Sequence, residues 1–156
     1  MRSIINIFRV SLFGHRYIED YRYLNDRLIP VISLLLQTKP YVSFFIGRNG
    51  EFDEYTASII KSLRKKSGKE NCDLTLVLPY TVANIEYYEK YYDSIIIPEI
   101  LCYAHPKTAI TLKNQWMIEH SDLVILNVER NCGGAYSALK YAKKLNKPIL
   151  NLCSLQ

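Results

Sequence analysis

The sequence predicts a Rossmann-like α/β fold, with an open, mostly parallel sheet of about six strands and helices on both faces. Short apolar runs recur along the chain, and most are continuous rather than alternating, which is typical of strands buried on both faces of a parallel sheet. Between them, apolar residues recur at the three-to-four spacing of amphipathic helices. Strand and helix therefore alternate about six times, as in an open α/β sheet.

The apolar runs place the six expected strands at residues 4–13, 41–46, 74–78, 94–97, 123–127 and 148–152. The helical patterns between them cover residues 17–37, 52–66, 83–92, 107–120 and 135–145. Pro30 lies inside the first helical pattern. Because proline cannot donate the hydrogen bond of a helix interior, we expect it to kink this helix or to start a second segment.

The length and composition favour a single domain over residues 1–156. Hydrophobic residues make up 49% of the chain and charged residues 22%, a globular composition that excludes disorder. No run approaches the length of an apolar transmembrane helix. The apolar start, residues 1–13, is broken by Asn6 and Arg9, and no signal-peptide cleavage pattern follows it. We therefore expect a cytoplasmic protein with no membrane partner.

The charge balance favours an anionic partner. Lys and Arg total 20 against 15 Asp and Glu, which gives a net charge of +5. Such a balance suits a phosphate-bearing ligand and, less strongly, a nucleic acid. The cysteines form no C-x-x-C pair, so we expect reduced, mostly buried thiols and no metal site or cofactor. They are Cys72, Cys102, Cys132 and Cys153.

Candidate ligand contacts follow the apolar runs, because open α/β sheets bind ligands outside the carboxyl ends of their strands. After the first run, a turn glycine precedes a histidine and an arginine, and arginine can hold a phosphate through two parallel hydrogen bonds. After the fifth run, paired glycines open a helix, whose free N–H groups favour phosphate. These two turns supply Gly14, His15, Arg16, Gly133, Gly134 and Ala135.

The turn after the second run also places two glycines directly before a helix, so its backbone can approach a ligand closely. Its candidates are Gly47, Arg48, Asn49 and Gly50. The turn does not match the Walker pattern of nucleotide-binding loops. Glu51 and Asp53 follow in the first helical turn, where carboxylates stabilise a helix. They are also the catalytic candidates if the protein is an enzyme.

Three further residues are candidate ligand contacts, although they could instead serve to pack the core. Tyr80 follows the third run, where its ring could stack on a base. Lys113 and Asn114 lie on the fourth expected helix and could face the ligand.

In order, these motifs resemble the SLOG superfamily, which joins DprA-like and LOG proteins. The motifs are Gly-His-Arg after a strand, Gly-x-x-Gly-x-Phe-Asp, Leu-Val-Leu-Pro-Tyr, Lys-Asn-Gln-Trp-Met, Ser-Asp-x-Val-Ile and Gly-Gly-Ala-Tyr. The likeness spans about residues 7–152 and is greatest to the short YpsA/YoqJ-like branch of bacterial proteins. It implies a Rossmann-like domain for nucleotides or nucleotide-derived ligands. Members of the superfamily include nucleotide phosphoribohydrolases, sensors of ADP-ribose-type signals and DNA-binding proteins.

One departure from the family pattern bears on catalysis. LOG enzymes carry Pro-Gly-Gly-x-Gly-Thr-x-x-Glu, and the glutamate is needed for cleavage. Here Lys140 stands at the position of that glutamate. A basic residue cannot stabilise an oxocarbenium-like transition state as a carboxylate does. Hydrolysis would therefore need a substitute such as Glu51 or Asp53.

Together these observations predict a protein that binds a nucleotide, ribose-phosphate or ADP-ribose-like ligand at the carboxyl ends of the strands, as a sensor or sequestering protein. One alternative is an enzyme that cleaves the N-glycosidic bond of a nucleotide or nucleoside. A second is DNA binding, as in DprA-like relatives. Tyrosines within residues 87–92 also suggest a homo-oligomer, because tyrosine is enriched at protein interfaces.

Overall fold

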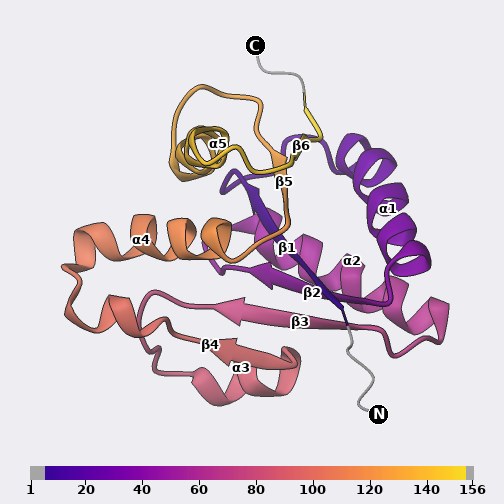
Figure 1. Cartoon of the computed structure of the whole chain (residues 1–156), viewed down its shortest axis with the longest axis horizontal. Coiled ribbons are helices and arrows are strands. Elements are labelled where there is room, and N and C mark those ends of the chain that lie inside the picture. Colours follow the sequence, from indigo (N-terminus) through magenta and orange to yellow (C-terminus); the bar gives the residue numbers. More distant parts are fainter. Residues whose placement is uncertain (1–5, 154–156) are drawn as a thin grey trace.

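The computed structural model describes residues 6–153, which form an α/β fold with one parallel six-stranded sheet. The strand order is β4-β3-β2-β1-β5-β6, and every neighbouring pair is parallel (Figure 1). The strands are β1 Ile7–Gly14, β2 Tyr41–Ile46, β3 Cys72–Val77, β4 Ser94–Ile96, β5 Leu123–Asn127 and β6 Ile149–Asn151. The predicted Rossmann-like fold class is confirmed. Residues 4 and 5 of the first expected strand lie outside the described residues.

Helices connect successive strands. They are α1 Tyr21–Thr38, α2 Glu51–Ser67, α3 Ile85–Tyr91, α4 Pro106–Glu119 and α5 Gly134–Lys144, with a 3₁₀ helix, η1, at Glu99–Tyr103. None of the helices within residues 6–153 has the length and apolarity to cross a membrane.

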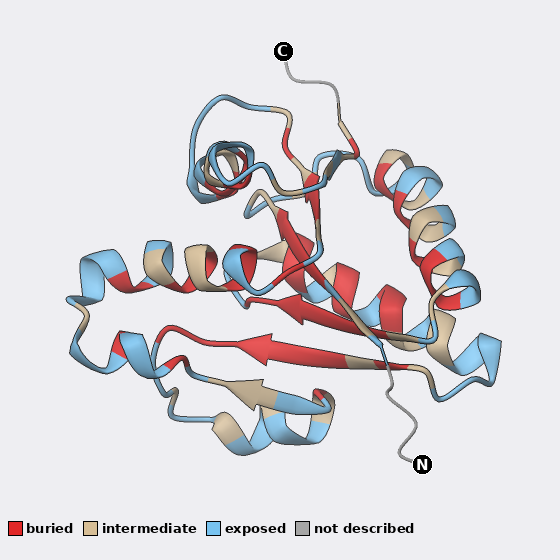
Figure 2. Cartoon of the chain, in the orientation of Figure 1, coloured by how far each residue is buried: buried red, intermediate tan, exposed pale blue. Residues whose placement is uncertain are grey.

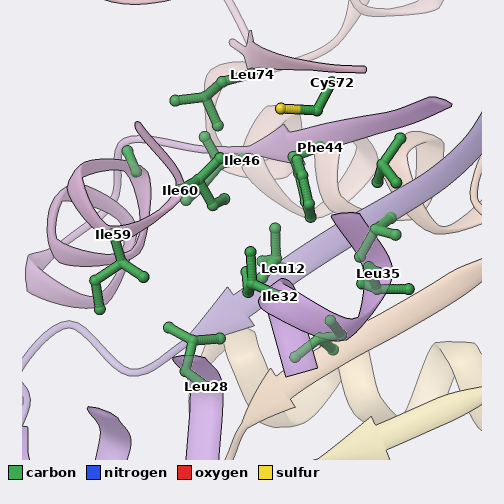
Figure 3. Packing of buried hydrophobic residues seen from close by; sticks show 14 of the residues in the cluster. Leu12, Leu28, Ile32, Leu35, Phe44, Ile46, Ile59, Ile60, Cys72 and Leu74 are labelled. Carbon is green, nitrogen blue, oxygen red and sulfur yellow. The ribbon is translucent and has the colours of Figure 1, made fainter. Parts of the chain in front are cut away.

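The core consists of two layers, one on each face of the sheet. Adjacent strand residues point to opposite faces, so Phe44 packs towards α1 and α2, whereas Phe45 packs towards α4 and α5. Figure 3 shows the first layer, in which Ile32 of α1 and Ile60 of α2 belong to the same cluster as Phe44. Figure 2 shows the same arrangement as buried central strands flanked by helices with one buried side. This burial explains why the strand sequences are continuously apolar.

Local capping sets two helix starts. The Asp20 carboxylate accepts the backbone N–H of Tyr23 at 3.0 Å, so α1 begins at Tyr21 and not at residue 17 as expected. Before α4, the side chain of His105 accepts the N–H of Lys107 at 3.1 Å, and a proline follows at the first helical position.

Helix α1 continues through Pro30 without a break. The expectation that Pro30 starts a second helical segment is therefore wrong. Pro30 and Asp26 are both exposed, so water can solvate the Asp26 carbonyl that loses its helical partner. On the opposite side of the helix, Leu28 and Ile32 are fully buried and hold α1 against the sheet.

The cysteines are less buried than expected. All four are free, but only Cys72 is buried; Cys102 and Cys132 are exposed. The prediction of mostly buried thiols is wrong because Cys102 lies in η1 and Cys132 in the turn before α5, both at the surface.

Candidate functional site

A cleft of about 480 Å³ opens where the carboxyl ends of β1 and β5 lie side by side. The strand order reverses here, because β1 pairs with β2 on one side and with β5 on the other. Open α/β sheets bind ligands in the crevice at this switch point. The cleft is lined by Leu12, Phe13, Gly14, His15, Arg16, Tyr17, Gly47, Asn49, Asp53, Ile110, Lys113, Asn114, Arg130, Cys132, Gly133, Gly134 and Ala135.

The turn before α5 presents backbone N–H groups to the cleft. Gly133, at the N-cap of α5, has a φ of 89°, a left-handed conformation that favours glycine. Gly133 has no side chain with which to cap this end of the helix, and the helix dipole makes the end positive. Arg16 and Arg130 line the same cleft. This arrangement favours an anionic group such as a phosphate.

Asn114 of α4 brings an unpaired buried amide to the same place. Its side chain is only 8% exposed, and its Oδ1 has no hydrogen-bond partner among the described residues. A Cβ added to Gly134 would lie 3.9 Å from Asn114 Nδ2, so the amide lies beside the start of α5. An unsatisfied buried polar group costs about 1–3 kcal/mol. A ligand that donates to Oδ1 would remove that cost.

Lys113 lies beside Gly47 and Asp53 in the cleft. It is 1% exposed, and a Cβ added to Gly47 would come within 2.6 Å of its Nζ and 3.5 Å of Asp53 Oδ2. Position 47 therefore accommodates the lysine because it has no side chain. Among the described residues, Lys113 forms no ion pair.

Burial shifts the pKa values of both Lys113 and Asp53. It lowers the pKa of Lys113 to about 8, and the charge of Asp53 opposes this shift. Burial also raises the pKa of Asp53, against the opposing effects of the Asn49 N–H and of Lys113. The Asn49 N–H donates to Asp53 Oδ2 at 2.7 Å, so this carboxyl also supports the start of α2. The cleft therefore contains an acid and a base whose pKa values burial shifts towards each other.

His15 connects the end of β1 to the turn after β5. Its Nε2 accepts the backbone N–H groups of Glu129 at 3.2 Å and of Arg130 at 3.3 Å. An acceptor at Nε2 requires a neutral ring with its proton on Nδ1. Burial, followed by the charge of Arg130, lowers the pKa of His15 and favours this neutral form. His15 thereby positions the loop that carries Arg130.

Most of the predicted ligand contacts meet in this cleft, but Arg48, Gly50 and Tyr80 do not line it. Arg48 is exposed and donates to the Tyr88 hydroxyl at 3.2 Å. Gly50 packs against the backbone of Arg16, whose carbonyl accepts the N–H of Glu51 at 2.7 Å.

Glu51 and Tyr80 also lie elsewhere. The Glu51 carboxylate accepts the Ile18 N–H at 2.9 Å and the Tyr21 hydroxyl at 3.4 Å, so it holds the loop before α1. Tyr80 lines a separate, apolar cavity after β3. Of the two carboxylates predicted as catalytic, only Asp53 lines the cleft.

Sequence reasoning missed Arg130, Cys132 and Ile110, which all line the cleft. Arg130 and Cys132 lie between the fifth strand and the paired glycines, so the position rule that selected Gly133 would also have selected them. Ile110 has a weaker signal, its place one helical turn before Lys113 and Asn114. Lys140, at the family glutamate position, is exposed and lies over the Tyr136 ring, outside the cleft.

No protein-family model and no curated protein matches the chain. Several solved structures are similar in fold, among them the following three. The protein TM1055 superposes with a TM-score of 0.56 at 13% identity, over 91% of this chain and 72% of that one. DNA processing protein A (DprA) from Helicobacter pylori, which binds single-stranded DNA, gives 0.61 at 16% identity over 91% of this chain. DprA from Streptococcus pneumoniae gives 0.63 at 12% identity over 92%.

The likeness to these structures shows the fold. This chain covers 63% of the Helicobacter and 49% of the Streptococcus DprA chain, so it corresponds to part of those proteins. The chain has the Rossmann-like fold found in DprA, as the resemblance to the SLOG superfamily predicted. Its assignment to the YpsA/YoqJ-like branch stays a prediction.

Proposed function

We propose that the cleft binds a nucleotide or a nucleotide-derived ligand through its phosphate. The observation that carries this proposal is the convergence of the start of α5 with Arg16, Lys113 and Arg130 in one cleft at the switch point of the sheet. Backbone N–H groups at Gly134 and Ala135 would hold the phosphate oxygens, and the arginines would pair with them. The volume of about 480 Å³ lies in the usual range for small-molecule sites.

The buried side chains would select the sugar end of the ligand. Asn114 Oδ1 would accept a ribose hydroxyl, because it has no partner among the described residues. Lys113 has no ion pair within residues 6–153, so an anionic ligand would also stabilise the charged form of this lysine. Binding without turnover corresponds to a sensor or a sequestering protein.

A second candidate function is cleavage of an N-glycosidic bond, and Asp53 is the observation in its favour. Asp53 is 8% exposed in the cleft, and burial raises its pKa, which favours the protonated carboxyl. Such a group can protonate a leaving base. Glu51 is the weaker candidate because its carboxylate is held by Ile18 and Tyr21.

Thermal unfolding with a panel of AMP, ADP-ribose, NAD and free phosphate, followed by chromatography of each mixture, tests both functions. A ligand at 100 times its Kd stabilises the folded state by about 2.7 kcal/mol. Stabilisation with the ligand recovered intact supports a binding protein, and release of free base supports the hydrolase. The absence of stabilisation by every member of the panel would contradict the proposed function.

A further inference from the structure

A second cavity lies at the same edge of the sheet. It measures about 580 Å³ and is bounded by segments that follow β3 and β4 and by the start of α4. Pro79 and Tyr80 come directly after β3, Ile97 follows β4, and Leu101 belongs to η1. Because all strands are parallel, these segments share the carboxyl edge with the phosphate cleft.

One face of α4 borders both spaces. Ala109 lines the apolar cavity, and Lys113, four residues later, lines the phosphate cleft. Residues four apart lie on one helix face and are separated by about 6 Å along the axis. Ile110, three residues before Lys113, also lines the cleft and is 39% exposed. The two spaces therefore follow each other along α4.

The chemistry of the two spaces differs. The charged residues that line the cleft are Arg16, Asp53, Lys113 and Arg130, whereas no charged residue within residues 6–153 lines the cavity. Leu101 and Ala109 are buried in its wall, and the Tyr80 ring is 48% exposed at its rim. An exposed ring beside an apolar wall suits a flat aromatic group, which gains from stacking and from loss of contact with water.

The strand order gives the distance between the start of α5 and Tyr80. The start of α5 follows β5 and Tyr80 follows β3, and these strands are three intervals apart in the sheet. At about 4.8 Å per interval this is about 14 Å. A ligand that reaches from one end to the other must be longer than a sugar phosphate alone.

We infer that the ligand is elongated, with its phosphate at the start of α5 and a flat aromatic or apolar group in the cavity beside Tyr80. The inference rests on the proposed function and adds to it the class of ligand: phosphate esters that carry an aromatic group at a distance from the phosphate, rather than free sugar phosphates. The exposed Tyr80 ring forms one wall of the aromatic compartment.

The test compares the affinities of ribose 5-phosphate, AMP and ADP-ribose for the full chain and for two variants. For the unaltered protein we expect AMP or ADP-ribose to bind at least about tenfold more tightly than ribose 5-phosphate, the gain of one stacked base. Tyr80→Ala removes the ring, and Ala104→Phe, at a half-buried position in the cavity lining, reduces its volume. Both variants should lose most of this gain and keep their affinity for ribose 5-phosphate.

Tyr87→Ala is the matched control, because Tyr87 is 64% exposed and lies on α3, away from both spaces. It should bind all three ligands as the unaltered chain does. The inference fails if ribose 5-phosphate binds as tightly as AMP and ADP-ribose. It also fails if Tyr80→Ala and Ala104→Phe bind AMP and ADP-ribose with the affinity of the unaltered chain. In both cases the proposed function stands. If none of the three ligands binds the unaltered chain, both fail together.

Discussion

At the scale of single residues, Lys113 is the side chain that distinguishes a ligand site from ordinary packing. A buried lysine without an ion pair among the described residues weakens a fold, because burial disfavours the charged form. The chain nevertheless places Lys113 against Gly47 and Asp53 in a cleft that also receives the start of α5. Such a costly arrangement is typical of functional sites.

Lys113→Met should therefore separate binding from stability. We expect AMP affinity to fall about tenfold to a hundredfold, the loss of a hydrogen bond to a charged group. The melting temperature should stay equal or rise, because an apolar side chain of similar length replaces a buried ammonium. Lys107→Met, at an exposed position of the same helix, is the control and should change neither quantity. Unchanged AMP binding by Lys113→Met would contradict the assignment.

The same lysine predicts a pH dependence of stability. Its pKa falls from 10.5 to about 8 on folding, so between these values the unfolded chain binds more protons than the folded chain. The free energy of unfolding attributable to Lys113 therefore rises as the pH increases through this window. Denaturant titrations across it should show that the free energy of unfolding of the unaltered chain, measured relative to that of Lys113→Met, rises with pH. An equal pH dependence of the two proteins would rule out this role of Lys113.

His15 predicts a second pH dependence, on the acid side. Its pKa lies below 6.5 in the folded chain, so the unfolded chain takes up the proton first as the pH falls. Stability should then decrease as the pH falls through about 6.5, the ordinary pKa of histidine. His15→Gln keeps an acceptor for the N–H groups of Glu129 and Arg130 but cannot titrate. Melting curves should show a smaller acid loss in this variant, and an equal loss would refute the role of His15.

At the scale of secondary structure, the contact of β1 with α2 brings two walls of the cleft together. The end of β1 passes so close to α2 that a Cβ at Gly14 would overlap the Phe52 ring. Phe52 is 1% exposed and belongs to the core on the α1 and α2 side. This packing fixes where His15 and Arg16 leave the sheet.

Gly14→Ala should consequently destabilise the protein by about 1–3 kcal/mol, the usual cost of overpacking a core. Gly134→Ala is the matched control, since its added Cβ would meet nothing closer than 3.9 Å and its φ is not positive. We expect the control to change stability by less than about 0.5 kcal/mol. Urea unfolding measures both values, and equal effects of the two substitutions would contradict the packing described for β1 and α2.

At the scale of the whole molecule, the sequence was sufficient for the fold and for most residues that line the cleft, but not for side-chain geometry. The continuous apolar runs identified every strand of the sheet, because a parallel sheet is buried on both faces. The rule that ligands meet the carboxyl ends found Gly133 and Asp53. It could not separate Asp53 from Glu51, because their helical positions send one carboxylate into the cleft and the other to the Ile18 N–H.

The distribution of charge bears on DNA binding. The helices run opposite to the strands, so the basic ends of α2 and α5 lie at the edge of the sheet away from the cleft. They carry Arg64, Lys65 and Lys66 in α2, and Lys143 and Lys144 in α5. We expect only weak, steeply salt-dependent binding of a single-stranded oligonucleotide, which AMP does not displace. Tight binding that AMP displaces would favour DNA as the ligand of the cleft.

Self-association stays a prediction at this scale. Tyr87 is 64% exposed, but its ring packs edge-on against Tyr88, and Tyr91 packs in the same way against Tyr92. Light scattering across a range of protein concentrations would measure the oligomeric state directly.

An amide NMR titration with AMP tests the central claim most directly, because it reports on each backbone N–H group. The claim predicts that the largest shifts occur at Gly133, Gly134 and Ala135, with smaller ones at Gly47 and Asn49 across the cleft. It also predicts that Lys113→Met greatly weakens these shifts. Shifts confined to the basic end of α2, or no shift at the start of α5 when AMP binds, would contradict the claim.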